Sequence, residues 1–336
     1  MRIDLPTRAR WPASTWTAVV ASGLAGTACN VSPPLPSDCP PGMDCNQPAV
    51  PSVIATPDHV TTQVGSPVTF HAVTPNVPAT GLTYQWSRSS DGGAHYATIA
   101  GATTDTLTLP APNLADDATD FVVTATRSGL SGAAVTHLAV AASPGVVFHD
   151  GEFALSDWVA TPLAQGVVPA PTQSAQATAT GGFPGAWRSM VVQFAPTYTR
   201  GTVVHASLPS TWDPASQGAI YVIDYAEDGI AQASTFASYT QSALLLEQAG
   251  RRYVSDTRDS YQRMSTTWAV SMSLASLHPQ EFHLIDGPAC GVGETCPDFS
   301  SAGAVMRFGY WRESASSTDT AVASGIDNWS VTVWRR

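Results

Sequence analysis

The chain has 336 residues, of which 43% are hydrophobic and 12% are charged, a composition typical of a globular protein with room for two cores. All 15 basic residues are arginine, which excludes chemistry that needs a lysine, such as Schiff-base formation or phosphate binding by a P-loop. The formal net charge of -11 disfavours binding to nucleic acid or to anionic lipid.

Residues 1–28 have the pattern of a secretory signal peptide, because three arginines precede a modest apolar stretch and small residues follow it. The ending Gly26-Thr27-Ala28-Cys29 resembles a bacterial lipoprotein lipobox, although Gly26 replaces the usual leucine. The resemblance implies that Cys29 is lipidated and holds the protein on the outer membrane or cell surface. Cleavage at an ordinary signal-peptidase site would instead give a secreted protein. No other stretch approaches the ~20 apolar residues of a membrane span.

Residues 29–52 are crowded with proline and predict an extended, semi-rigid tether. Four of the five cysteines form two pairs with the same spacing, Cys39 with Cys45 and Cys290 with Cys296. Zinc ligands usually come in closer pairs, so this spacing favours disulfides over metal ligands or free thiols. Disulfides imply an oxidising compartment.

Residues 53–142 alternate apolar and polar positions over short runs, with turn residues about every ten positions, and predict a β-sandwich. Gly65–Ala72 looks like strand B of a bacterial immunoglobulin-like domain, and Tyr84–Trp86 looks like strand C with its core tryptophan. Asp117–Val123 resembles the corner that leads into strand F. The two positions that are cysteines in antibody domains are apolar here, so we expect this domain to be held by packing alone.

Residues 146–336 contain about nine strand candidates and no convincing helix, which favours a jelly roll or a related double sheet. The predicted strands are Val146–Phe153, Trp187–Phe194, Thr202–Leu208, Ala219–Tyr225, Ser242–Glu247, Trp268–Ser273, Glu281–Leu284, Val305–Trp311 and Ile326–Trp334. The predicted fold is therefore all-β, an immunoglobulin-like sandwich followed by a jelly-roll-type sandwich.

The two ends of this second domain, Asp150–Phe153 and Gly325–Val331, resemble the first and last strands of carbohydrate-binding jelly rolls. The resemblance implies that these strands lie side by side and that acids there, Glu152 and Asp327, hold a structural calcium. Ala154 stands where that family has an acid just after the phenylalanine.

The segment Gln217–Asp228 combines the strongest strand signal with a cluster of acids. Asp224 and Asp228 are four residues apart, about 13 Å on a strand. Glycosidase carboxylates are roughly 5.5 Å apart in retaining enzymes and at most about 9.5 Å apart in inverting ones. This strand alone therefore cannot supply a catalytic pair, and Glu247 is the best partner from elsewhere.

Asp224 is flanked by apolar residues on both faces of its strand, so we expect it to be buried and paired with Arg188, Arg252 or Arg307. No serine motif, phosphate loop or histidine spacing points to other chemistry.

Sugar binding needs exposed aromatic rings with polar neighbours. The aromatic candidates are Trp187, Tyr198, Trp212, Tyr225, Tyr253, Tyr261 and Trp311. Trp212 lies between two prolines in a predicted loop, and Tyr225, Glu227 and Asp228 form the acidic strand end, so these four are the predicted ligand-binding residues. A basic patch, Arg251–Tyr253 with Arg258–Arg263, suits acidic glycans or is a solvated hairpin.

The sequence thus predicts a non-catalytic binding or adhesion protein, exported to the cell surface or secreted. Its expected partner is a polysaccharide or another cell-surface ligand, with membrane contact only through the lipid anchor and no nucleic acid. Two alternatives stay open: a glycan-active hydrolase or lyase on the second domain, and a purely structural surface protein.

Overall fold

The structure is a computed structural model and describes residues 49–164, 170–194, 200–231, 238–257, 259–262, 268–285, 287, 290, 296–316 and 321–335. The signal peptide, Cys29 and the pair Cys39 and Cys45 lie outside these residues and stay predictions. Within the described part of the chain, no helix is long and apolar enough to cross a membrane.

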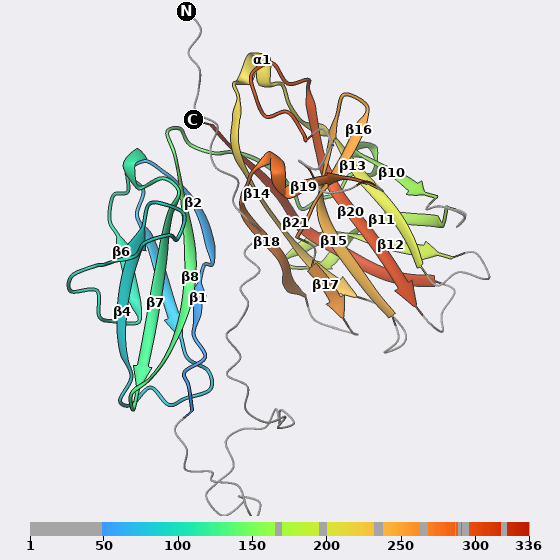
Figure 1. The fold of residues 1–336 in the computed structure, drawn as a ribbon. Coiled ribbons are helices and arrows are strands. Elements are labelled where there is room, and N and C mark those ends of the chain that lie inside the picture. Colours follow the sequence, from blue (N-terminus) through green and yellow to red (C-terminus); the bar gives the residue numbers. More distant parts are fainter. Residues whose placement is uncertain are drawn as a thin grey trace, which may run out of the picture. The chain divides into compact units, whose positions relative to one another are not determined.

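Two sheets form the N-terminal sandwich (Figure 1). The three-stranded sheet has the order β1 (Ile54–Thr56), β3 (Val68–Val73) and β6 (Thr106–Leu109). The five-stranded sheet has the order β2 (His59–Gln63), β8 (Leu130–Ala141), β7 (Thr119–Arg127), β4 (Thr83–Ser89) and β5 (Ala97–Thr98). β2 and β8 run parallel, and a 3-10 turn, Leu114–Asp116, precedes β7.

The core of this sandwich contains Trp86, as the sequence predicts. Phe70 comes from the smaller sheet, and its ring centroid lies 6.4 Å from that of Trp86 and 5.5 Å from that of Phe121. The Trp86 indole donates a hydrogen bond to the carbonyl of Thr104. The apolar residues at the two antibody cysteine positions, Ala72 and Val123, are buried, so aromatic packing takes the place of a cross-link.

Two further sheets, antiparallel in every pairing, form the C-terminal sandwich (Figure 1). We call the larger one the β15 sheet; its order is β10 (Trp158–Leu163), β13 (Arg200–Trp212), β20 (Met306–Ser316), β15 (Ser238–Gln248), β16 (Arg251–Ser255) and β19 (Phe282–Leu284), with β17 (Asp259–Gln262) also paired to β15. The other, the β14 sheet, has the order β11 (Thr172–Gly182), β12 (Gly185–Gln193), β21 (Ala321–Arg335), β14 (Ile220–Ala231) and β18 (Ala269–Leu277). β9 (Val146–Asp150) also pairs with β21.

All nine predicted strands of this domain are present, as β9, β12, β13, β14, β15, β18, β19, β20 and β21. The sequence did not predict β10, β11, β16 and β17. β11, for example, is made only of Thr, Gln, Ser, Ala and Gly, which gives little strand signal. The first and last strands lie side by side as expected, with Asp150 opposite Trp329. In the described part of this domain, the helical structure is α1 (Pro214–Gln217) and short 3-10 turns such as Leu155–Asp157 and Pro279–Glu281.

Aromatic side chains join the two C-terminal sheets. The Trp158 ring, from the β15 sheet, lies 5.1 Å from that of Trp329 in the β14 sheet and 5.2 Å from that of Tyr310. Apolar residues from both sheets surround these rings, and burying them supplies the main stabilisation of the sandwich. The protein is all-β, an immunoglobulin-like sandwich followed by a jelly-roll-type sandwich.

Candidate functional site

The four predicted ligand-binding residues lie in the interior rather than on the surface. Trp212 is the last residue of β13, not part of an exposed loop, and its indole donates to the Gly218 carbonyl at 2.9 Å. Trp212, Tyr225 and Glu227 are each 1% exposed and Asp228 is 7% exposed. The expectation of a surface platform is corrected, because the register of β13 against β20 shifts between Ala206 and Thr211 and so turns Trp212 toward the core.

The other aromatic candidates do not supply a stacking face either. Trp187, Tyr253 and Trp311 are also buried. Tyr198 and the side chain of Tyr261 lie outside the described residues. None of the described candidates therefore presents an open ring to a sugar.

Glu227 belongs to a buried polar cluster in the C-terminal core. Its carboxylate accepts hydrogen bonds from the Tyr225 hydroxyl and from Nη2 of Arg312, which lies 3.3 Å away. Tyr310 stacks on His205 at 4.4 Å between ring centroids. Burial raises the pKa of Tyr310 to about 12, and burial with the nearby arginines holds the pKa of His205 well below its usual value. The cluster is therefore structural, with Arg312 neutralising Glu227.

The predicted calcium ligands do not converge on a site. Glu152 is exposed, whereas Asp327 is fully buried and accepts hydrogen bonds from the backbone N–H groups of Phe183 and Asn328. Asn328 also donates to Asp228 at 2.7 Å. Among the described residues, no three His, Cys, Asp or Glu side chains gather in a way that could hold a metal ion.

Asp224 also differs from its prediction. It accepts hydrogen bonds at 2.7 Å from the Ser276 backbone and from the Trp334 indole. Arg252 and Arg307, two of its three predicted partners, pair with Glu247 instead.

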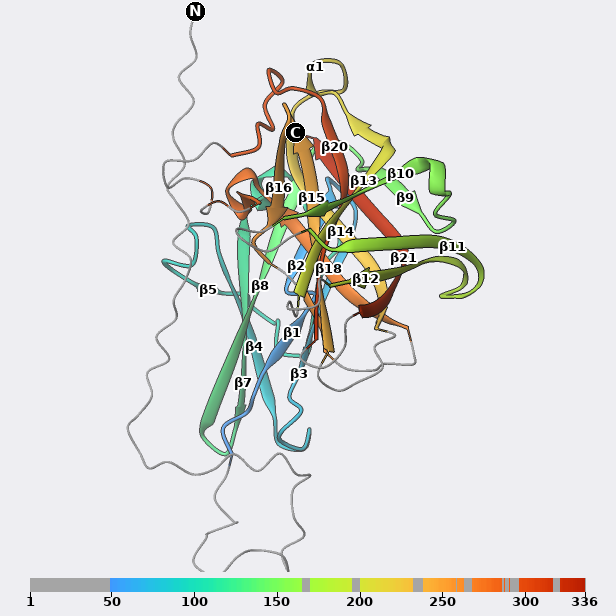
Figure 2. The ribbon, with the colours of Figure 1, turned by 90° about the vertical axis from the view of Figure 1, so that its right-hand side faces the viewer.

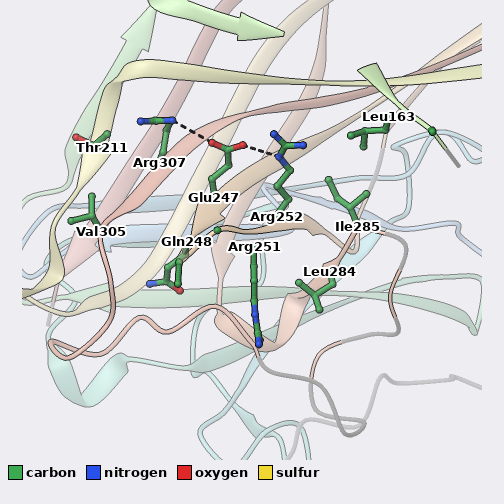
Figure 3. Close-up of a pocket in the computed structure, with 13 residues that line it drawn as sticks. Leu163, Thr211, Glu247, Gln248, Arg251, Arg252, Leu284, Ile285, Val305 and Arg307 are labelled. Atoms are coloured by element: carbon green, nitrogen blue, oxygen red, sulfur yellow. Dashed lines mark hydrogen bonds and ion pairs between the residues drawn. The ribbon is translucent and has the colours of Figure 1, made fainter. Parts of the chain in front are cut away.

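A row of side chains crosses four strands on the outer face of the β15 sheet, and Glu247 lies at its centre (Figure 3). Glu247 is directly opposite Arg252 of β16 and Arg307 of β20, and Thr211 of β13 is opposite Arg307. Glu247 Oε1 lies 2.9 Å from Arg252 Nε, and its Oε2 lies 3.5 Å from Arg307 Nη1. Leu246, the preceding residue, points into the core, so this row faces away from it.

The row forms part of the wall of a surface groove of about 710 Å³, a volume within the range of ligand sites. Leu163, Leu284, Ile285 and Val305 provide apolar parts of the wall (Figure 3). Leu163 and Ile285 also pack on a second apolar cluster, which lies on this same outer face and is formed by Val204, Ala206, Ala243, Leu245, Val254 and Trp311. The groove thus combines charged groups with an apolar surface.

The β15–β16 hairpin fixes the end of the groove. Its two turn residues, Ala249 and Gly250, both have positive φ, 52° and 76°, as in the tight turns that match strand twist. Gln248 is buried and donates to the carbonyls of Asp298 and Ala304 at 2.8 and 2.9 Å. These bonds attach the segment that leads to Val305 to the hairpin.

A disulfide joins Cys290 to Cys296 just before that segment, with Cα atoms 5.1 Å apart. This confirms the predicted pairing. The bridge and the Gln248 hydrogen bonds together hold the chain beside the groove in place.

The groove is positively charged in a negatively charged protein. Among the residues that the structure describes, its lining contains three guanidinium groups, Arg251, Arg252 and Arg307, and one carboxylate, Glu247, which gives +2, whereas the whole chain carries -11. A concave site of one sign concentrates ligands of the opposite sign. Arginine is also well suited to bind a carboxylate or a sulfate group through two parallel hydrogen bonds.

The groove is poorly equipped for glycoside hydrolysis, which needs two carboxyl groups. Its described lining offers Glu247 alone, and that carboxylate is paired with two arginines. Asp228 lies in the β14 sheet and is buried, so it does not line this groove. The lining residues that the structure describes also include no aromatic residue.

Part of this groove is predictable from the sequence. The predicted basic patch contains Arg251 and Arg252, and Glu247 is the predicted partner carboxylate, but Arg307, like Arg252, is predicted as a possible partner of Asp224. Glu247 and Arg252 flank a two-residue turn symmetrically, a signal that places them opposite each other. No local signal connects Arg307, 60 residues away, to Glu247. The rest of the basic patch, Arg258 and Arg263, lies outside the described residues.

The fold and the groove define a protein of two β-sandwiches with a positively charged groove on the second. No family model matches the chain, and no curated protein matches it. Among solved structures, bovine butyrophilin is similar over 46% of this chain and 90% of its own, with 15% identity and a TM-score of 0.20. A structure of infectious bursal disease virus strain Gt is similar over 77% of this chain and 54% of its own, with 8% identity and a TM-score of 0.23. These TM-scores are too low to support an argument.

Proposed function

We propose that this chain is an exported, non-catalytic binding protein whose groove on the β15 sheet binds an acidic polysaccharide. The observation that carries the proposal is the row Arg307, Glu247 and Arg252 beside an apolar wall. The guanidinium groups would bind the carboxylates or sulfates of the polymer, while the apolar residues would contact the C–H faces of its sugar rings.

The charge of the groove supports an acidic rather than a neutral glycan. Neutral sugars are usually held by stacking on open aromatic rings, and the lining described above has none. A surface position, reached through the signal peptide and the Cys29 anchor or by secretion, would bring the groove into contact with such polymers. Cell-surface adhesion is the role that fits these properties.

Titration calorimetry with a polyuronate, such as polygalacturonate, tests the proposal, with a neutral glucan as the comparison. We expect binding to the polyuronate alone, and weaker binding at higher salt because the contacts are ionic and partly exposed. The double substitution Arg252→Gln and Arg307→Gln should abolish binding. Arg200→Gln is the matched control, since Arg200 is exposed on the same sheet but is not part of the groove.

Equal binding of the neutral glucan, or unchanged binding by the double variant, would show that the groove is not the acidic-glycan site. A catalytic role would instead appear as reducing ends or unsaturated products released from the polymer. We expect no such products.

A further inference from the structure

β11 is an edge strand of the β14 sheet without the protection that edges normally have. It spans 11 residues, Thr172–Gly182, and among the described strands it pairs with β12 alone (Figure 2). Exposed edges are usually blocked by charged residues, by proline, by bulges or by shortness, because their free backbone groups invite pairing with another strand. β11 has no charged residue and no proline.

The other described edges of the C-terminal sandwich carry such protection. β10 contains Pro162, and β19 is only three residues long. β9 and β17, which also pair with one strand each, have five and four residues and carry the charged residues Asp150 and Asp259. β18 is interrupted by two register shifts in its pairing with β14. β11, by contrast, keeps regular register with β12 from Thr172 to Thr178 and shifts only after that. The contrast singles out this seven-residue run as the edge that is open to pairing.

The side chains of residues 172–178 are compatible with pairing to a second strand of the same sequence. Thr172, Ser174 and Gln176 are exposed on one face. On the opposite face, Ala175 packs against the core. In an antiparallel pair centred on Ala175, Thr172 would face Thr178 of the second copy and Ser174 would face Gln176. Such pairs of hydroxyl and amide side chains are favourable, and no like charges meet.

Charge also favours a second copy at this edge rather than elsewhere. Each chain carries -11, so two copies repel one another wherever their acidic surfaces meet. A two-fold contact brings each surface residue near its own equivalent, and a neutral strand is the surface that tolerates this. We propose that β11 pairs antiparallel with β11 of a second copy of this chain, with the two-fold axis at Ala175, and so joins the two β14 sheets into one.

Sedimentation velocity on the full chain over a range of concentrations tests the proposal. We expect a species of twice the 35.1 kDa chain mass. Ser174→Lys combined with Gln176→Lys places lysines directly opposite each other in the pair. The dissociation constant of the dimer should therefore rise at least roughly tenfold. The matched control, Val73→Lys combined with Val147→Lys, adds the same charge at exposed positions of other strands and should leave the dimer intact.

Hydrogen exchange on the unmodified protein tests the β11 pairing independently. Alternate amides of residues 172–178, those that point away from β12, should become protected as concentration rises. A monomer at every concentration, a dimer that the double lysine variant leaves unchanged, or exchange at these amides that does not depend on concentration would each overturn the proposal.

Discussion

Glu247 and Arg252 lie directly opposite each other across the β15–β16 hairpin, with the carboxylate Oε1 2.9 Å from Arg252 Nε. The second oxygen of the same carboxylate lies 3.5 Å from Arg307. One acid thus holds two arginines in place and also occupies part of their hydrogen-bonding capacity. An acidic ligand would have to share these guanidinium groups with Glu247.

Replacing Glu247 with glutamine should strengthen binding of a polyuronate while changing stability little. The loss of one nearby negative charge removes about 1 kcal/mol of repulsion, which corresponds to roughly fivefold tighter binding. Partly exposed ion pairs contribute about 1 kcal/mol or less to stability. Calorimetric titration and thermal melting measure both effects. Glu152→Gln, at an exposed site outside the groove, controls for net charge. Weaker binding by Glu247→Gln would mean that Glu247 itself contacts the ligand.

Removing the charge of Glu227 should destabilise the C-terminal sandwich strongly. The Glu227 and Arg312 side chains are 0% and 1% exposed, so Glu227→Gln leaves the Arg312 charge inadequately compensated in the core. Breaking such a buried pair costs about 3–5 kcal/mol. Urea unfolding followed by tryptophan fluorescence measures the loss. Adding Arg312→Met to the variant should restore part of the stability; no restoration would show that other partners of Arg312 dominate.

Trp212→Ala should act on stability rather than directly on a ligand. The side chain is 1% exposed and packs in the main core cluster, and removing a buried tryptophan costs about 3–5 kcal/mol. The melting temperature should fall sharply, with Trp212→Phe showing a smaller change. If the Trp212→Ala variant melts normally but no longer binds the polyuronate, Trp212 contacts the ligand after all.

His205 should make the C-terminal sandwich less stable in mild acid. Burial, with Arg188 and Arg312 nearby, holds its pKa in the folded protein well below the usual value of about 6.5. The unfolded chain therefore binds a proton at His205 as the pH falls below about 6.5, and the folded chain does not. The free energy of unfolding is therefore unaffected by protonation of His205 above that pH. Below it, protonation of His205 in the unfolded chain lowers the free energy of unfolding by up to about 1.4 kcal/mol per pH unit.

The substitution His205→Phe isolates this effect, because phenylalanine keeps a ring for stacking on Tyr310 and does not titrate. Unfolding free energies measured between about pH 7 and pH 5 should fall less steeply for the variant. Burial raises the pKa of Asp228 and of Glu281, whose titration has the opposite sign, and the comparison of the two proteins cancels both. Equal slopes would show that His205 takes up its proton over the same pH range in the folded and the unfolded chain.

Much of the architecture follows from local sequence. Alternation and β-branched residues located all nine predicted strands of the second domain, because a half-covered strand needs that pattern. The core role of Trp86 and the bridge between Cys290 and Cys296 were also predicted. Strands made of small polar residues, such as β11, were missed because their pairing depends on neighbours rather than on their own composition.

The sequence by itself determined the all-β class, most of the strands and the absence of lysine chemistry. Only the tertiary structure decided which side chains are available to a ligand. Trp212 looked exposed in sequence and is buried, whereas Arg307 and Glu247, 60 residues apart, share one groove. The reason is physical: the period of a strand sets which residues share a face, but strand order and sheet packing decide which face is covered and which residues stand opposite one another.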